Sequence, residues 1–218
     1  MFSQNIFLNT GVNLTTYDYK NSSGGSSENV LSSNGMFYEL GYSVPLDFSK
    51  RSRGWGRYSR MQFETSFTLN DYNATGGNSL DNYDWKSQYA GLRTGVEYMV
   101  FPNNAVTLSV EGSFGFETLL NGKQKIGGET FNLKDSEEFN GLFITPKFGL
   151  NAVYNVTEDV GLSGGLHFSK ALSMKGESRN ETLQFNNTHF SFGITIQAYW
   201  YEKISFIFLF NNIFKFLL

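Results

Sequence analysis

The chain has 218 residues, a net charge of −3 and no cysteine. This length suits one sizeable domain. The slightly acidic balance excludes the basic footprint of a nucleic-acid-binding protein. The lack of cysteine excludes disulfides, thiolate chemistry and cysteine-based zinc sites. No apolar run reaches the roughly 18 to 20 residues that a transmembrane helix requires.

The first residues, Met1-Phe2-Ser3-Gln4, look like the end of a secretory signal with cleavage near Ser3. We therefore expect residues 1–5 to be the remnant of a processed N-terminus. An ordinary short N-terminus is the alternative.

The strongest pattern is a strict alternation of large apolar residues with small or polar ones. In residues 36–48 the apolar set is Met36, Tyr38, Leu40, Tyr42, Val44, Leu46 and Phe48. A period of two indicates a β-strand with one face in an apolar environment. Eight such stretches are expected as strands, at 6–19, 36–48, 58–70, 87–100, 106–117, 141–154, 160–173 and 188–201.

The connections between these stretches alternate in length. Those at 20–35, 71–86, 118–140 and 174–187 are long and polar, whereas those at 101–105 and 155–159 are short and the one at 49–57 is intermediate. Long loops at one end and tight turns at the other are typical of outer-membrane barrels. This arrangement predicts long extracellular loops and termini in the periplasm.

The orientation of the two faces separates a membrane barrel from a soluble one of the lipocalin type, whose apolar face points inward around a ligand. Here the second face is rich in glycine and serine rather than in lysine, glutamate and threonine, and includes Gly41, Gly91, Gly149 and Gly165. Glycine weakens an exposed strand but relieves crowding in a narrow lumen. We therefore expect the large apolar face to point outward into lipid.

Aromatic residues gather near the expected strand ends, as the two interfacial girdles of a membrane barrel require. The lower set is Phe48, Trp55, Tyr58, Tyr98, Phe101, Tyr154 and Trp200, and the upper set is Tyr17, Tyr38, Trp85, Phe116 and Phe190. Pro146 lies within an expected strand and cannot donate to the ladder. A bulge or an irregular upper strand would accommodate it.

The charged residues of the inward face can be arranged in pairs. Symmetric hairpins set Arg60 against Glu97, Glu64 against Arg93, and Glu111 against Lys147, and a slip of two residues makes each pair diagonal. Because unpaired charges are very costly in a narrow lumen, these pairs favour a filled interior. A polar pore with a selectivity ring is the alternative.

His167 and Ser169 form the most distinctive short motif. It resembles the His-x-Ser core of the outer-membrane lipid A deacylases, in which serine attacks an ester and histidine acts as base. That family continues with asparagine, whereas this chain has Lys170, and both residues are expected to face inward. His189 repeats the pattern, but the expected register places its ring well over 10 Å from that of His167. The sequence therefore predicts no metal site and no cofactor, and leaves an esterase as an alternative function.

A basic run with one tryptophan occupies the connection predicted to be periplasmic: Lys50, Arg51, Arg53, Trp55 and Arg57. Such a run is a candidate contact for phospholipid head groups or an acidic partner, and equally reads as a solvated turn.

The stretch 6–201 resembles the small eight-stranded outer-membrane barrels typified by OmpX and the membrane domain of OmpA. The resemblance lies in the hairpin rhythm, in segments such as 91–98 and 146–154, and in a last strand that ends in aromatic residues. It implies a filled barrel in the bacterial outer membrane, insertion by the assembly machinery, and loops that contact partners or lipopolysaccharide. Residues 202–218 form an apolar tail that such chains usually lack.

We therefore predict an all-β protein, an eight-stranded antiparallel up-and-down transmembrane barrel with a polar, filled lumen. The expected role is non-enzymatic and exerted through the loops, as a structural or adhesive protein or a subunit of a larger envelope complex. A small pore or a conduit for apolar molecules is the second hypothesis.

Overall fold

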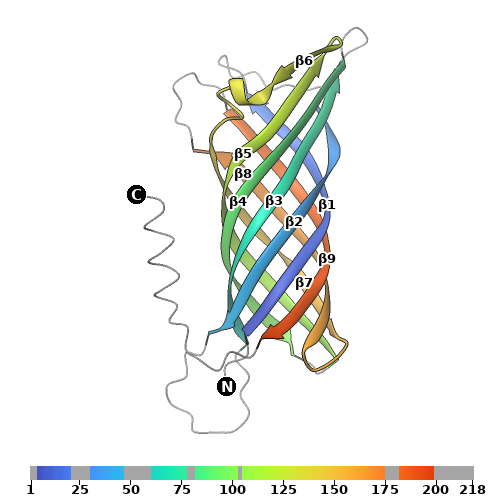
Figure 1. The fold of residues 1–218 in the computed structure, drawn as a ribbon, viewed down its shortest axis with the longest axis vertical. Helices are drawn as coiled ribbons and strands as arrows, with labels where there is room; N and C mark the ends of the chain where they lie inside the picture. Colours follow the sequence, from blue (N-terminus) through green and yellow to red (C-terminus); the bar gives the residue numbers. More distant parts are fainter. Residues whose placement is uncertain are drawn as a thin grey trace.

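A computed structural model describes residues 4–20, 30–46, 60–77, 82–102, 105–174 and 182–198. Nearly all of them lie in long strands that wind around one axis (Figure 1). The elements are β1 (Gln4–Lys20), β2 (Val30–Pro45), β3 (Met61–Gly77), β4 (Asn82–Phe101), β5 (Val106–Ile126), β6 (Glu129–Asn132), η1 (Leu133–Asp135), β7 (Leu142–Asn155), β8 (Val160–Ser173) and β9 (Thr182–Ala198).

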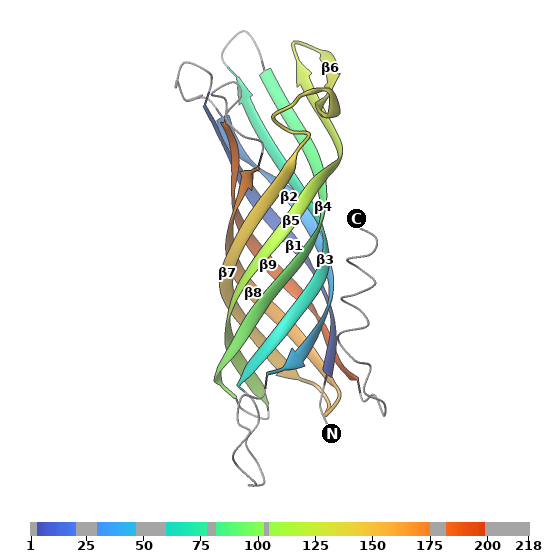
Figure 2. The ribbon, with the colours of Figure 1, turned by 90° about the vertical axis from the view of Figure 1, so that its left-hand side faces the viewer.

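Eight of these strands close into an antiparallel barrel, as the sequence predicted. Each pairs with its neighbours in chain order, β9 pairs with β1, and β5 pairs with both β4 and β7. The short β6 pairs with β5 and projects beyond one end of the barrel (Figure 2). Among the described residues no helix is long and apolar enough to cross a membrane.

The two faces of the barrel wall have opposite character. Outward residues are large and apolar, for example Leu40, Phe114 and Phe192, which are 55%, 59% and 61% exposed. Inward residues are polar and buried, for example Glu39 and Lys147. An apolar exterior around a polar, packed interior is the architecture of a transmembrane barrel and excludes the lipocalin arrangement.

Glycine in the inward face makes room for this interior. A Cβ atom on Gly165 would lie 2.6 Å from Cε1 of His167 and 2.7 Å from Oγ of Ser191. By contrast, a Cβ on Gly112, which faces outward, would meet nothing within 4 Å. The glycine pattern therefore reflects crowding inside the lumen.

The strands extend further at the upper end than the alternation of apolar residues suggested. Much of the predicted loops 71–86 and 118–140 is strand, since β3 reaches Gly77, β4 begins at Asn82 and β5 has 21 residues. A strand of this length rises about 49 Å at a tilt near 45°, well beyond a hydrocarbon core of about 30 Å. Gly127 and Gly128, with φ of 55° and 91°, then form the two-residue turn into β6.

The lower end is compact. Gln4 faces Ala198, so β1 begins where β9 ends, next to the short connection between β7 and β8. In that connection the hydroxyl of Thr157 accepts hydrogen bonds from the backbone N–H groups of Asp159 and Val160. The tight turns are thus at the end where the first strand begins and the last one ends.

Pro146 faces outward in the middle of β7. Its strand continues without interruption, and the ladder to β8 passes from the pair Ile144–Leu172 directly to the pair Lys147–Ser169. The register is the same on both sides, so no extra residue is inserted. The barrel accommodates Pro146 because two successive residue pairs, those of Thr145 and Pro146, are missing from the β7–β8 ladder. No bulge is needed.

The expected lower aromatic girdle is present in part, since Tyr98, Phe101 and Tyr154 are exposed near the lower end. Tyr38, Phe116 and Phe190 are exposed as well, but they lie midway along β2, β5 and β9 rather than near the upper strand ends. The expectation is wrong for Tyr17 and Trp85, which point into the barrel and pack against each other. Phe48, Trp55, Tyr58 and Trp200 lie outside the described residues.

Candidate functional site

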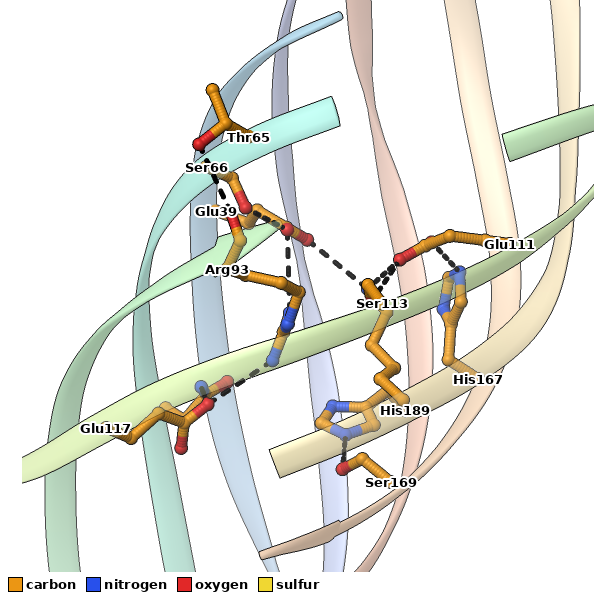
Figure 3. A network of polar contacts seen from close by, with 12 residues as sticks. Glu39, Thr65, Ser66, Arg93, Glu111, Ser113, Glu117, His167, Ser169 and His189 are labelled. Atoms are coloured by element: carbon orange, nitrogen blue, oxygen red, sulfur yellow. Dashed lines mark hydrogen bonds and ion pairs between the residues drawn. The ribbon is translucent and has the colours of Figure 1, made fainter. Parts of the chain in front are cut away.

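The interior of the barrel contains a continuous network of buried charges at mid-height (Figure 3). Its five carboxylate, guanidinium and ammonium members alternate in sign, a histidine ends the series, and the six residues come from five strands. They are Glu117 (β5), Arg93 (β4), Glu39 (β2), Lys147 (β7), Glu111 (β5) and His167 (β8). We call this set the charge network.

Arg93 holds one half of the network. Its Nη1 lies 3.5 Å from Oε1 of Glu39, and its Nη2 lies 3.3 Å from Oε1 of Glu117. The hydroxyl of Ser66 donates to Glu39 at 2.6 Å, and that of Tyr72 donates to Glu117 at 2.6 Å. Each carboxylate is thus bound both by a cation and by a neutral donor, as buried charges require.

Lys147 holds the other half. Its Nζ lies 3.2 Å from Oε1 of Glu111 and 3.6 Å from Oε2 of Glu39. His167 contacts Glu111 at 3.2 Å and the side-chain oxygen of Asn151 at 2.8 Å. Glu39 therefore bridges the two cations, and the network crosses the lumen from wall to wall.

Of the three expected pairs, only Glu111 with Lys147 forms among the described residues. Lys147 contacts Glu111, diagonally across the β5–β7 ladder. The β3–β4 ladder is shifted by two residues from the expected register, so Arg93 faces Ser66 and Glu64 is its diagonal neighbour. The side chain of Arg93 reaches Glu39 and Glu117 instead.

The pair of Arg60 with Glu97 is also absent. Arg60 is exposed at the lower edge, just before β3 begins. Glu97 accepts hydrogen bonds from Ser109 and Asn151, and it shares a further hydrogen bond with Glu64. Among the described residues, the lower lumen therefore contains two adjacent carboxyl groups without a paired cation. The basic run Lys50, Arg51, Arg53, Trp55 and Arg57 lies outside the described residues.

The two histidines lie closer together than the sequence suggested. His167 faces His189 directly across the β8–β9 ladder, so the expected separation along the strands is wrong. Their side chains nevertheless bind different groups. His167 contacts Glu111, whereas Nε2 of His189 lies 2.7 Å from Oγ of Ser169. No group of ligands suited to a metal ion occurs in the described part of the chain.

Ser169 and His189 have the spacing of a nucleophile and its base. The hydroxyl also accepts a hydrogen bond from Asn187, and Phe37 packs edge-on against the imidazole at 5.5 Å. Ser169 is 8% exposed and His189 is 2% exposed, and both point into the lumen. The motif partner proposed from the sequence, His167, is not the residue that binds Ser169.

Above the charge network the lumen is filled by apolar and aromatic side chains. Phe185 is at the centre, with ring centroids 4.7 Å from Tyr17, 5.1 Å from Tyr72 and 5.2 Å from Phe143. We call this set the aromatic plug. Its buried members are Tyr17, Tyr72, Ala74, Tyr89, Leu119, Leu133, Phe139, Phe143, Ala171, Leu183 and Phe185.

The segment between β6 and β7 covers the aromatic plug from above. Leu133 of η1 is fully buried, and the hydroxyl of Tyr89 donates to the carbonyl of Phe139 at 3.1 Å. This cluster was not expected from the sequence. Tyr17 and Tyr89 share the parity of the inward residues Gly11 and Gly91, so their placement could have been predicted, whereas Tyr72 and Phe185 lie in stretches that were predicted as loops.

Comparisons with known proteins find similar solved structures at low sequence identity. No protein-family model matches the chain, and no curated protein does. Among solved structures, Neisserial surface protein A matches 89% of this chain and 97% of its own, with 13% identity and a TM-score of 0.48. The attachment invasion locus protein Ail of Yersinia pestis matches 90% and 100%, with 11% identity and a TM-score of 0.41. The outer membrane enzyme PagL matches 85% and 99%, with 13% identity and a TM-score of 0.32. The barrel architecture of this chain follows from its own strand pairing, and such a fold hosts unrelated activities.

Proposed function

We propose that this protein is a non-enzymatic barrel of the bacterial outer membrane that acts through its extracellular part. In this arrangement the tight turns, the start of β1 and the end of β9 face the periplasm. The upper extensions of the strands face the outside of the cell. The role is structural or adhesive, or that of an accessory subunit in an envelope complex.

The observation that carries the proposal is the double closure of the lumen. The charge network crosses the barrel at mid-height, and the aromatic plug fills it above. An eight-stranded barrel has an interior that side chains can fill. A protein whose interior is packed in this way presents only its outer surface and its upper strands to partners.

The pore hypothesis requires a continuous opening past both layers. Single-channel recording in planar bilayers tests it. We expect the purified barrel to give no stable unitary currents, and reproducible unitary steps would contradict the proposal.

The esterase hypothesis requires a serine that an ester can reach. Ser169 and His189 are buried beneath the aromatic plug and face away from lipid. We expect the number of ester-linked acyl chains on lipid A to be unchanged when the protein is expressed, with a Ser169→Ala variant as control. Loss of an acyl chain with the wild type but not with the variant would establish the enzyme instead.

A further inference from the structure

Gly115 of β5 differs from the other inward glycines of the described strands. A Cβ atom on Gly115 would lie 3.4 Å from Oε1 of Glu117 and 3.6 Å from Nε of Arg93, which are ordinary contact distances. On each of the other inward glycines whose surroundings are described, a Cβ would come within 3.0 Å of another atom. The lumen beside Gly115 therefore has room for a methyl-sized group that the packed side chains do not fill.

This space lies where the charge network meets the aromatic plug. Gly115 faces Arg93 across the β4–β5 ladder and Thr145 across the β5–β7 ladder. Glu117, two residues further along β5, projects from the same face of the strand. Its carboxylate contacts Arg93 of the charge network and Tyr72 of the aromatic plug (Figure 3).

Two buried polar atoms next to this space have no hydrogen-bond partner among the described residues. They are Nε of Arg93 and Oγ1 of Thr145. Arg93 is 4% exposed and Thr145 is fully buried, so bulk water does not reach them. Buried polar groups in native proteins are almost always hydrogen-bonded, and those that the chain leaves unpaired are commonly bound to an enclosed water molecule.

The chemistry of the surrounding groups selects the ligand. The Nε–H group of Arg93 requires an acceptor, whereas the carboxylate of Glu117 accepts and does not donate. An anion at this point would be repelled by Glu117, and a cation would be repelled by Arg93. A small neutral molecule that both accepts and donates hydrogen bonds meets these requirements, and water is the smallest one.

We propose that the space beside Gly115 is a binding site for a single water molecule. The water accepts a hydrogen bond from Nε of Arg93 and donates hydrogen bonds to Oγ1 of Thr145 and Oε1 of Glu117. It joins β4, β5 and β7 inside the barrel and completes the contacts of the charge network. One enclosed water leaves the lumen closed, so this inference goes beyond the proposed function and does not depend on it.

The test compares substitutions of Gly115 by urea unfolding of the barrel in lipid vesicles. Gly115→Ala displaces the water and leaves Nε of Arg93 unpaired, so we expect the equilibrium constant of unfolding to rise about tenfold. Gly115→Ser supplies a hydroxyl group in place of the water, so we expect a constant within about twofold of the wild type. Gly112→Ala is the matched control, because Gly112 lies on the outward face of the same strand, where a Cβ meets nothing within 4 Å.

The opposite sign is expected if no water binds beside Gly115. A methyl group would then fill free space and restrict the unfolded chain, which lowers the equilibrium constant of unfolding about two- to fivefold. A constant for Gly115→Ala that equals or falls below that of Gly112→Ala would overturn the inference.

A crystal structure of the purified wild-type barrel gives a second reading that does not depend on any variant. We expect one electron-density peak about 2.7–3.2 Å from Nε of Arg93, on the side of Gly115. Well-ordered side chains of Arg93, Thr145 and Glu117 with no peak between them would contradict the proposal. The site is inside the lumen, so its failure leaves the proposed role of the extracellular part standing.

Discussion

Removal of Lys147 tests whether the charge network stabilises the barrel as a connected unit. Its Nζ contacts Glu111 at 3.2 Å and Glu39 at 3.6 Å, and all three side chains are at most 6% exposed. In Lys147→Met both carboxylates lose a cation in a buried environment. We expect a loss of about 3–5 kcal/mol in the free energy of unfolding. In Lys147→Met/Glu111→Gln one carboxylate is neutral, so the loss is smaller than the sum of the single losses by about 1–3 kcal/mol.

The assay is urea unfolding in lipid vesicles, followed by far-UV circular dichroism. Lys170→Met is the matched control, because Lys170 is an exposed lysine on the outward face of β8. Its removal leaves no buried carboxylate and takes a charge off a lipid-facing wall, so stability is unchanged or increased. Losses for Lys147→Met and Glu111→Gln that add to within about 0.5 kcal/mol in the double variant would refute the coupling.

Three further predictions use the same urea assay. Gly165→Ala places a Cβ against His167 and Ser191 and should lower the free energy of unfolding by about 1–3 kcal/mol. Gly112→Ala, on the outward face, should change it by less than about 0.5 kcal/mol. Equal effects of the two substitutions would argue against a crowded lumen. Phe185→Ala removes the central ring of the aromatic plug and should lower the free energy of unfolding by about 3–5 kcal/mol. A loss below about 1 kcal/mol would mean that the plug is not tightly packed. Glu64→Gln replaces a carboxyl group that has no paired cation among the described residues, so stability should be unchanged or increased. A clear loss of stability would show that this carboxyl group has a stabilising partner.

The alternation of residues was sufficient to predict the barrel. In 36–48 it assigns Met36 and Leu40 to the outside and Glu39 and Gly41 to the inside, as the structure has them. This succeeds because a period of two is local to each strand. The alternation of large apolar residues ends where the strands leave the membrane, but the strands continue to pair beyond that point. The extensions of β3, β4 and β5 lack the apolar pattern and were therefore predicted as loops.

Register is not a local property, and most errors at the candidate site come from it. A symmetric hairpin set Glu64 against Arg93, and a shift of two residues sets Ser66 against Arg93 instead. The same kind of error separated His167 from His189, which face each other. Only Lys147 with Glu111 remained in reach, because two long side chains span a diagonal.

The network also depends on strands that are far apart in sequence. Glu39 joins Arg93 and Lys147 across the lumen, and no hairpin connects β2 to β7. A β-bulge in β5 was equally hidden: Gln88 pairs with Asn121 and Tyr89 with Leu119, so Leu120 is an extra residue, in a stretch whose sequence reads as an ordinary polar loop. Closure of the barrel, rather than any local pattern, brings these groups together.

The central claim is that the lumen is packed shut, and the absence of native cysteine allows a direct test. Ser113 is 4% exposed and points into the charge network, where it donates to Glu111. We predict that Ser113→Cys in the folded, membrane-inserted barrel does not react with a water-soluble maleimide and reacts fully after unfolding, while Lys134→Cys reacts in both states. Labelling of Ser113→Cys in the folded barrel at the rate of Lys134→Cys would show an open, water-filled lumen and contradict the account.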